Sequence, residues 1–242
     1  MASKEARMFA TVVILAVLAV SLFFVLILLK LFSPSAIPFG TFEFWEIRGN
    51  VYEWVRSVWL IFAWGIGFTA LVSIFTSNTP WVNRDAEGIL VSGFFTSLFA
   101  GVMEEIVFRW LLFLNSIVGL KVFNFFLLGF IGFGIPEMWY RFVMGPLANF
   151  VTFDVLHNIL LNHPGGWAVG AALLAANGFF RDGHKYQGRL GLINSWFIGM
   201  AMFWLLFRYG LVACIVIHFL YDLFIYIVRY IDATIERALG WV

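Results

Sequence analysis

Apolar residues in this chain fall into long runs, separated by short stretches rich in proline, glycine and charged residues. A helix needs about 20 such residues to cross the hydrocarbon layer of a bilayer. We therefore expect each run to form a membrane helix. The runs cover residues 8–29, 54–75, 86–118, 122–135, 147–161, 167–180, 190–207 and 211–231. The pattern predicts an all-α, polytopic transmembrane bundle of about eight helices, with residues 1–242 forming a single domain.

Composition supports the membrane class and excludes others. Hydrophobic residues make up 62% of the chain and charged residues only 12%, which is more apolar than a soluble domain needs. The formal net charge is +1 and there is no basic run, so a nucleic-acid partner is not expected. The single cysteine, Cys214, rules out a disulfide within the chain. The fold must therefore be held by helix packing in the lipid bilayer.

Crossing number and charge predict an orientation. Eight crossings return the chain to the side on which it began. The loops expected on that side hold more Lys and Arg than those on the other, which indicates the cytoplasm. We therefore expect an integral, multi-pass membrane protein with both termini cytoplasmic.

Aromatic residues gather near the predicted helix ends, as in an interfacial belt. We expect interfacial positions for Phe42, Phe44, Trp45, Tyr52, Trp54, Trp81, Trp139, Tyr140 and Trp241.

Ionisable residues inside apolar runs are costly and mark candidate chemistry. In the third run, Glu105 and Arg109 are four residues apart with the acid first, the favourable order for an ion pair. Glu104 has Phe108 at the same spacing and so keeps no counter-ion on its own helix. In a dry site such a carboxyl suits a general base. We expect a catalytic Glu104 and a supporting Glu105–Arg109 pair, although that pair could also serve helix packing alone.

Two further runs carry histidine. Phe153 and His157 are spaced i to i+4 in the run 147–161, and His218 and Asp222 have the same spacing in the run 211–231. On a helix, each spacing places both side chains on one face. We expect His157, His218 and Asp222 to converge on Glu104. His163 and His184 lie near helix ends or in the polar loop 181–189, and we assign them no role.

The ordered patterns Glu-Glu-x-x-x-Arg, Phe-x-x-x-His and His-x-x-x-Asp resemble the CAAX protease and bacteriocin-processing (CPBP) family of intramembrane endopeptidases, which includes the type II CAAX prenyl proteases. The resemblance covers a protease core of about residues 86–231. It implies a glutamic-type intramembrane endopeptidase in which Glu104 and His157 activate the attacking water. His218 and Asp222 would support the oxyanion, and Phe153, Glu105 and Arg109 would be structural. Because an ionised Asp222 repels an oxyanion, we expect it to orient His218 instead.

The sequence also leads to expectations about the cofactor and the substrate. We expect no cofactor and no metal, with a zinc-dependent protease at the same residues as the alternative. The expected partner is a membrane-associated or prenylated peptide substrate. Alternatives from other classes are a transporter or proton channel, a non-catalytic scaffold, and a haem protein that uses His157 and His218 as axial ligands.

Overall fold

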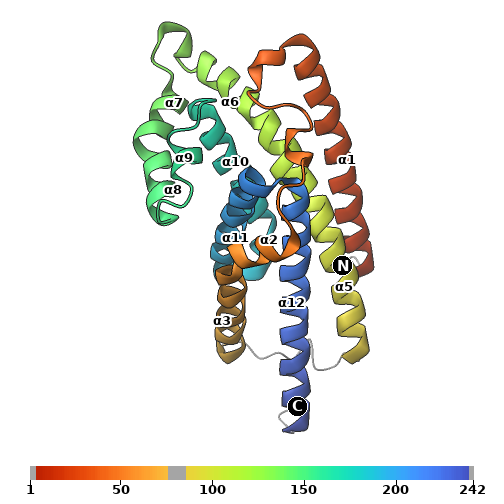
Figure 1. Ribbon diagram of the computed structural model, residues 1–242. Helices are drawn as coiled ribbons and strands as arrows, with labels where there is room; N and C mark the ends of the chain where they lie inside the picture. The colour runs from red at the N-terminus through yellow and green to blue at the C-terminus, as the bar shows by residue number, and fades with distance from the viewer. Residues whose placement is uncertain (1–3, 76–85, 240–242) are drawn as a thin grey trace.

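The computed structural model describes residues 4–75 and 86–239, and within these residues it is helical, with no strand. Figure 1 shows the helices packed as an elongated bundle. The main helices are α1 (Lys4–Phe32), α2 (Val51–Ser57), α3 (Trp59–Phe75), α5 (Ala86–Glu104), α6 (Phe113–Phe126), α7 (Ile135–Trp139), α8 (Gly145–Val151), α9 (His157–Leu160), α10 (Trp167–Gly183), α11 (Gly188–Tyr209) and α12 (Leu211–Ala238). Two π-helical segments, η3 (Glu105–Leu112) and η5 (Tyr140–Met144), and four 3₁₀ turns, η1 (Pro34–Ala36), η2 (Glu43–Trp45), η4 (Gly129–Ile131) and η6 (Lys185–Gln187), complete the described part.

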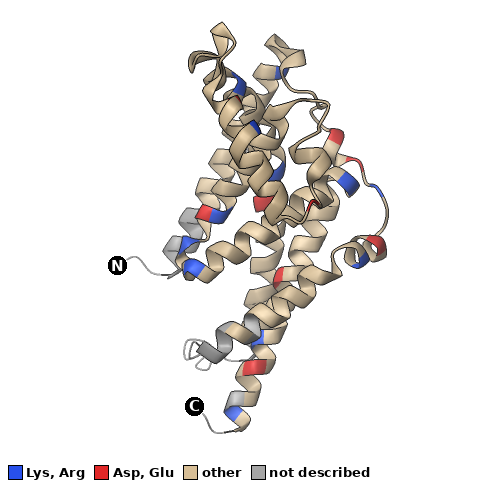
Figure 2. Ribbon diagram, turned by 90° about the vertical axis from the view of Figure 1, so that its left-hand side faces the viewer, with Lys and Arg blue, Asp and Glu red and all other residues tan. Residues whose placement is uncertain are grey.

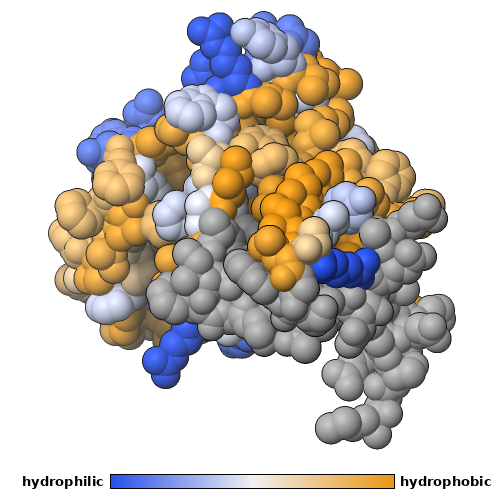
Figure 3. Space-filling view, turned by 90° about the horizontal axis from the view of Figure 1, so that it is seen from below, coloured by the Kyte–Doolittle hydropathy of each residue, from blue (hydrophilic) through white to orange (hydrophobic). Residues whose placement is uncertain are grey.

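Four helical stretches of the described chain are long and apolar enough to cross a membrane. They are Val12–Phe32, Gly88–Phe126, Lys185–Tyr209 and Leu211–Ile235. Figure 2 shows how sparse Lys, Arg, Asp and Glu are over these helices, and the coloured part of the view from below in Figure 3 is mainly hydrophobic, with hydrophilic groups toward its edge. The predicted all-helical membrane class is therefore supported, whereas the count of about eight spans stays a prediction.

The third predicted run and the start of the fourth, which were expected as two helices, form one continuous helical rod. α5, η3 and α6 follow each other without a break from Ala86 to Phe126, and η3 replaces an α-helical segment in the middle. A π-helix turns by less per residue than an α-helix and is frequent at functional sites. The interruption begins at Glu105, directly after Glu104. The two adjacent carboxylates therefore stand where the helix changes its winding.

α12 packs along α5 through glycines. A Cβ atom on Gly101 would lie 3.0 Å from the Ile215 carbonyl oxygen and 3.0 Å from the Phe219 backbone nitrogen, so the two backbones nearly touch there. At Gly93 a Cβ would overlap the Tyr226 ring. Small residues allow such close helix packing, which supplies dispersion contacts where water is absent. This approach carries α12 past Glu104 and Glu105.

The predicted helix over residues 147–161 is wrong. α8 ends at Val151, and α9 begins only at His157. Phe153 and Asp154 between them have φ values of 53° and 61°, in the left-handed region that ends a right-handed helix. Asp154 accepts a hydrogen bond from the Asn149 side chain at 2.5 Å, which closes this turn. Phe153 and His157 therefore do not share a helix face.

Some of the aromatic residues that were predicted to lie at the membrane interface are instead buried in the protein core. Phe44, Trp54 and Tyr140 are 2%, 4% and 5% exposed, and Phe44 packs edge-on against Phe113 and Phe207. Other belt positions, including Phe42, Tyr52 and Trp139, are exposed, as predicted. Trp81 and Trp241 lie outside the described residues. The segment between α1 and α2 folds inward because its aromatic rings are buried more favourably among other rings than at a wet interface.

Candidate functional site

The centre of the polar cluster is a buried trio from η3 and α12. Glu105 and Arg109 have fully buried side chains, and Glu105 Oε2 lies 3.3 Å from Arg109 Nε. The other carboxylate oxygen, Oε1, is 2.6 Å from Nδ1 of His218, whose side chain is 4% exposed. The predicted Glu105–Arg109 pair is confirmed. Glu105 also joins η3 to α12, a contact that sequence spacing did not indicate.

His218 lies between two carboxylates. Its Nε2 is 3.6 Å from Oδ2 of Asp222 on the next turn of α12, so the expected i to i+4 approach is present. Each ring nitrogen therefore faces an acidic oxygen, and both nitrogens can donate only when the ring is an imidazolium. Asp222 retains 30% exposure of its side chain, so it forms the open side of the cluster.

Glu104 faces a histidine that sequence reasoning left without a role. Its Oε2 lies 4.0 Å from Nε2 of His184, and this oxygen has no hydrogen-bond partner within the described residues. His184 Nδ1 is 2.8 Å from the carbonyl oxygen of Phe180. A carbonyl only accepts, so Nδ1 carries the proton and donates it. In the neutral ring, Nε2 then holds its lone pair toward Glu104.

Phe180 packs the cluster together. Its ring lies 3.8 Å from the Arg109 guanidinium carbon, 4.7 Å from the His184 ring centroid and 6.1 Å from the His218 ring centroid. A guanidinium over an aromatic face is attracted by the ring quadrupole, most strongly where water is absent. Phe180 therefore places α10 against both η3 and α12. This packing accompanies the approach of His184 to Glu104.

One side of the cluster is partly exposed, although the Glu104 oxygen nearest His184 is itself buried. The side chains of Glu104 and His184 are 20% and 18% exposed, whereas Glu105 and Arg109 have no exposed surface. His184 lies between α10 and η6, outside the stretches that qualify as spans. Burial lowers the pKa of His184 below its ordinary value of 6.5, although its hydrogen bond to the Phe180 carbonyl acts in the opposite direction. His184 is therefore neutral at pH 7 and able to accept a proton.

His157 does not join this cluster. Its Nε2 is 2.9 Å from the side-chain nitrogen of Asn162. α9, which it begins, packs near the start of α10, because a Cβ on Gly170 would lie 2.7 Å from the Leu160 carbonyl oxygen. His218 instead contacts Phe180, ten residues further along α10, or about 15 Å of helix. His157 therefore does not meet Glu104 and His218, contrary to the expectation from the sequence. For the same reason, His157 and His218 are not placed to bind one haem from its two sides.

Phe153 also lies apart from the cluster. It is 85% exposed and lies in the turn between α8 and α9, so it does not support the residues around Glu104.

The sequence contained a signal for the histidine that lies beside Glu104. The spacing Phe-x-x-x-His occurs twice, at Phe153 to His157 and again at Phe180 to His184. The second copy straddles the last turn of α10, and the structure brings both of its members to Glu104 and Arg109. Because His184 lies among charged loop residues, the sequence pattern placed it in a solvated loop rather than in a site.

Two cavities lie beside the described helices. One, of about 560 Å³, is bordered by α3, α11 and the turn that contains Phe153, and its lining is almost wholly apolar. The other, of about 440 Å³, lies between the end of α10 and α11. Among the described residues, no group of three or more His, Cys, Asp or Glu side chains is arranged to hold a metal ion.

No protein-family model, no curated protein and no solved structure matches this chain.

Proposed function

We propose that this protein hydrolyses peptide bonds within or at the surface of the membrane, with a water activated by Glu104 and His184. The observation that carries the proposal is the approach of Glu104 Oε2 to His184 Nε2 at 4.0 Å, at the partly exposed edge of a polar cluster whose centre is buried. This is the glutamic-type endopeptidase that the resemblance to the CPBP family implied, with His184 in the place first given to His157.

The separation of the two side chains suits a shared water. At 4.0 Å the two atoms are too far apart for a direct hydrogen bond. A water that donates one hydrogen to each of two acceptors holds them about 4.4 Å apart. The lone pair on His184 Nε2 and the carboxylate of Glu104 provide those acceptors. Together they can take a proton from the water as it attacks and return it to the leaving amine.

His218 provides the complementary positive group. A carbonyl under attack develops negative charge, and a fixed donor beside it lowers the barrier by several kcal/mol. Glu105 on one ring nitrogen and Asp222 beside the other favour a charged imidazole at this point. Asp222 then orients His218, and Arg109 with Phe180 holds Glu105 in place.

The substrate class follows from where the cluster lies. Glu104 and Asp222 fall inside the candidate spans Gly88–Phe126 and Leu211–Ile235. A peptide must therefore be membrane-associated to reach them, either as a hydrophobic segment or through a lipid such as a prenyl group.

Substitution of the two histidines tests the proposal. His184→Ala should reduce cleavage of membrane peptides in proteoliposomes by about 100-fold or more, the usual worth of a general base. His157→Ala is the matched control and should leave cleavage within about twofold. Glu104→Gln should abolish it. Loss of cleavage in His157→Ala with normal rates in His184→Ala would overturn the assignment, and no peptide cleavage by the wild type would overturn the function.

Zinc remains the alternative at the same residues. Histidine and carboxylate side chains are the usual ligands of a catalytic zinc with an open position. Exhaustive chelation of the purified protein, followed by zinc addition, separates the mechanisms. The glutamate mechanism requires full activity after chelation, whereas loss with recovery on zinc would replace it.

A further inference from the structure

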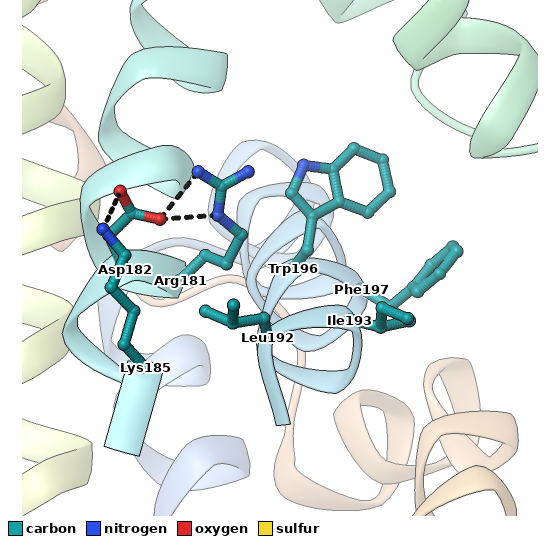
Figure 4. Close-up of a pocket in the computed structure, with 7 residues that line it drawn as sticks. All are labelled: Arg181, Asp182, Lys185, Leu192, Ile193, Trp196 and Phe197. Carbon is teal, nitrogen blue, oxygen red and sulfur yellow. Dashed lines mark hydrogen bonds and ion pairs between the residues drawn. The ribbon is translucent and has the colours of Figure 1, made fainter. Parts of the chain in front are cut away.

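A cavity with charged and apolar walls is lined by the residues on both sides of His184 in the chain. It has a volume of about 440 Å³ and lies between the end of α10 and the first half of α11. Figure 4 shows its two parts, a charged group from α10 and η6 and an apolar wall from α11. The charged residues are Arg181, Asp182 and Lys185, and the apolar residues used below are Leu192, Ile193 and Phe197.

In the charged part, the carboxylate of Asp182 bridges two cations, Arg181 and Lys185. Asp182 Oδ1 accepts from Arg181 Nε at 2.8 Å and pairs with Nη2 at 2.7 Å, while Oδ2 lies 3.0 Å from Lys185 Nζ. Hydrogen bonding to the two cations lowers the pKa of Asp182, which keeps it ionised. The trio has a net charge of +1. A guanidinium has five N–H donors and an ammonium three, so both cations retain donors beyond those that Asp182 engages.

The apolar part continues into the lipid-facing surface. α11 belongs to the candidate span Lys185–Tyr209, so Lys185 lies at the end of a span and Leu192, Ile193 and Phe197 lie further along it. Ile193 is 51% exposed and Leu190 47%. The charged part therefore lies where lipid headgroups begin, and the apolar wall runs in the direction that acyl chains take.

We propose that this cavity binds an anionic membrane lipid, with the phosphate on Arg181 and Lys185 and the first acyl carbons on Leu192, Ile193 and Phe197. A phosphodiester carries one negative charge, which neutralises the trio. Basic pockets between membrane helices bind anionic headgroups in this manner. A peptide carboxylate has the same charge, but it does not explain an apolar wall open to the bilayer along α11. The site is independent of the proposed hydrolysis.

Lipid retention by the full-length protein tests the proposal. The purified protein, exposed to equal phosphatidylglycerol and phosphatidylcholine, should retain phosphatidylglycerol preferentially in native mass spectrometry. The double substitution Arg181→Gln with Lys185→Gln should weaken this retention about thirtyfold. Both side chains are substantially exposed, so the fold should survive. Arg141→Gln, which removes an exposed, ion-paired arginine elsewhere, is the matched control and should change nothing.

Two further arms identify the source of the anion. Ile193→Asp keeps both cations but places a charge in the apolar wall, so it should weaken phosphatidylglycerol retention, and excess inorganic phosphate should not displace the lipid. Equal retention of the two lipids, or unchanged retention in the double variant, would overturn the proposal. So would displacement of phosphatidylglycerol by a hydrophobic peptide with a free C-terminal carboxylate but not by its amidated form, which would make this a peptide site.

Discussion

Adjacent residues Glu104 and Glu105 have different environments in this protein. Glu105 is fully buried and contacts both Arg109 and His218, so it connects two helices through charge. Glu104 is partly exposed, and its Oε2 lies 4.0 Å from His184 Nε2 without a hydrogen-bond partner among the described residues. The change of helical winding at Glu105 separates the two environments. Stability and chemistry should therefore divide between these two carboxylates.

Substitution of each glutamate by alanine or glutamine measures this division. Glu105→Ala leaves Arg109 and His218 as buried charges without their acid, which should lower the free energy of unfolding by about 3–5 kcal/mol. Glu104→Gln removes no hydrogen bond between described residues, so it should change the free energy of unfolding by less than about 1 kcal/mol. The same substitution should abolish cleavage. Thermal unfolding in detergent provides the measurement. Similar losses of stability in both variants would contradict the division of roles.

His184 should set the acidic limit of activity. Burial lowers its pKa below 6.5, so the imidazole is neutral above that pH and gains a proton only in more acidic solution. Protonation occupies Nε2 and removes the base, so the rate should fall as the pH drops below 6.5. The free energy of unfolding should depend on pH in the same direction as the rate. The contribution of the neutral His184 ring is present above pH 6.5 and is lost as the pH falls. The measurements are a pH–rate profile and NMR titration of the His184 ring. Titration of that ring above 6.5 would contradict this prediction.

At the scale of elements, the site depends on how closely α12 approaches the rod formed by α5, η3 and α6. Glu104 and Glu105 follow Gly101 by about one turn, and the backbones of α5 and α12 nearly touch at that glycine. Helices that pack this closely transmit a small displacement directly to the side chains of the next turn. The position of His218 relative to Glu105 is therefore set by the absence of a side chain at residue 101.

Two glycine substitutions separate packing from helix propensity. Gly101→Ala places a Cβ 3.0 Å from backbone atoms of α12 and should lower the free energy of unfolding by about 1–3 kcal/mol. Gly119→Ala on α6 meets no atom within 4 Å, so it should instead stabilise by up to about 1 kcal/mol. Thermal unfolding of both variants and their cleavage rates are the measurements. Equal effects would show that the close contact does not determine stability.

At the scale of the whole molecule, the helix directions determine which parts face the same side. In Figure 1, α1 begins at about the middle height of the bundle and runs upward, the turn from α10 into α11 lies at a similar height, and α12 ends at the bottom. Arg181 at the end of α10 and Lys185 in η6, the cations proposed to bind a headgroup, lie at this turn. Positive loop charge predicts that the side of the two termini is the cytoplasm.

Tags at the two ends test this arrangement. An even number of crossings requires both tags on one side of the membrane, so protease added to sealed vesicles should remove both tags or neither. The protein should remain with the membrane after a high-salt or alkaline wash and should require detergent for release. Accessibility of only one tag would require an odd number of crossings.

Sequence alone predicted that the described residues are helical, and it predicted the local pairs. Apolar runs long enough to cross a membrane produce helices in any arrangement, and the i to i+4 spacing fixes Glu105 beside Arg109 and His218 beside Asp222 because one helix carries both partners. Tertiary structure decided which histidine meets Glu104. Phe153 to His157 and Phe180 to His184 have the same local spacing, so no local rule separates them. Left-handed turns at Phe153 and Asp154 break the first, while packing of Phe180 against Arg109 brings the second to the cluster. Contacts between distant helices form only in the assembled bundle, and these contacts determine that His184 rather than His157 lies beside Glu104.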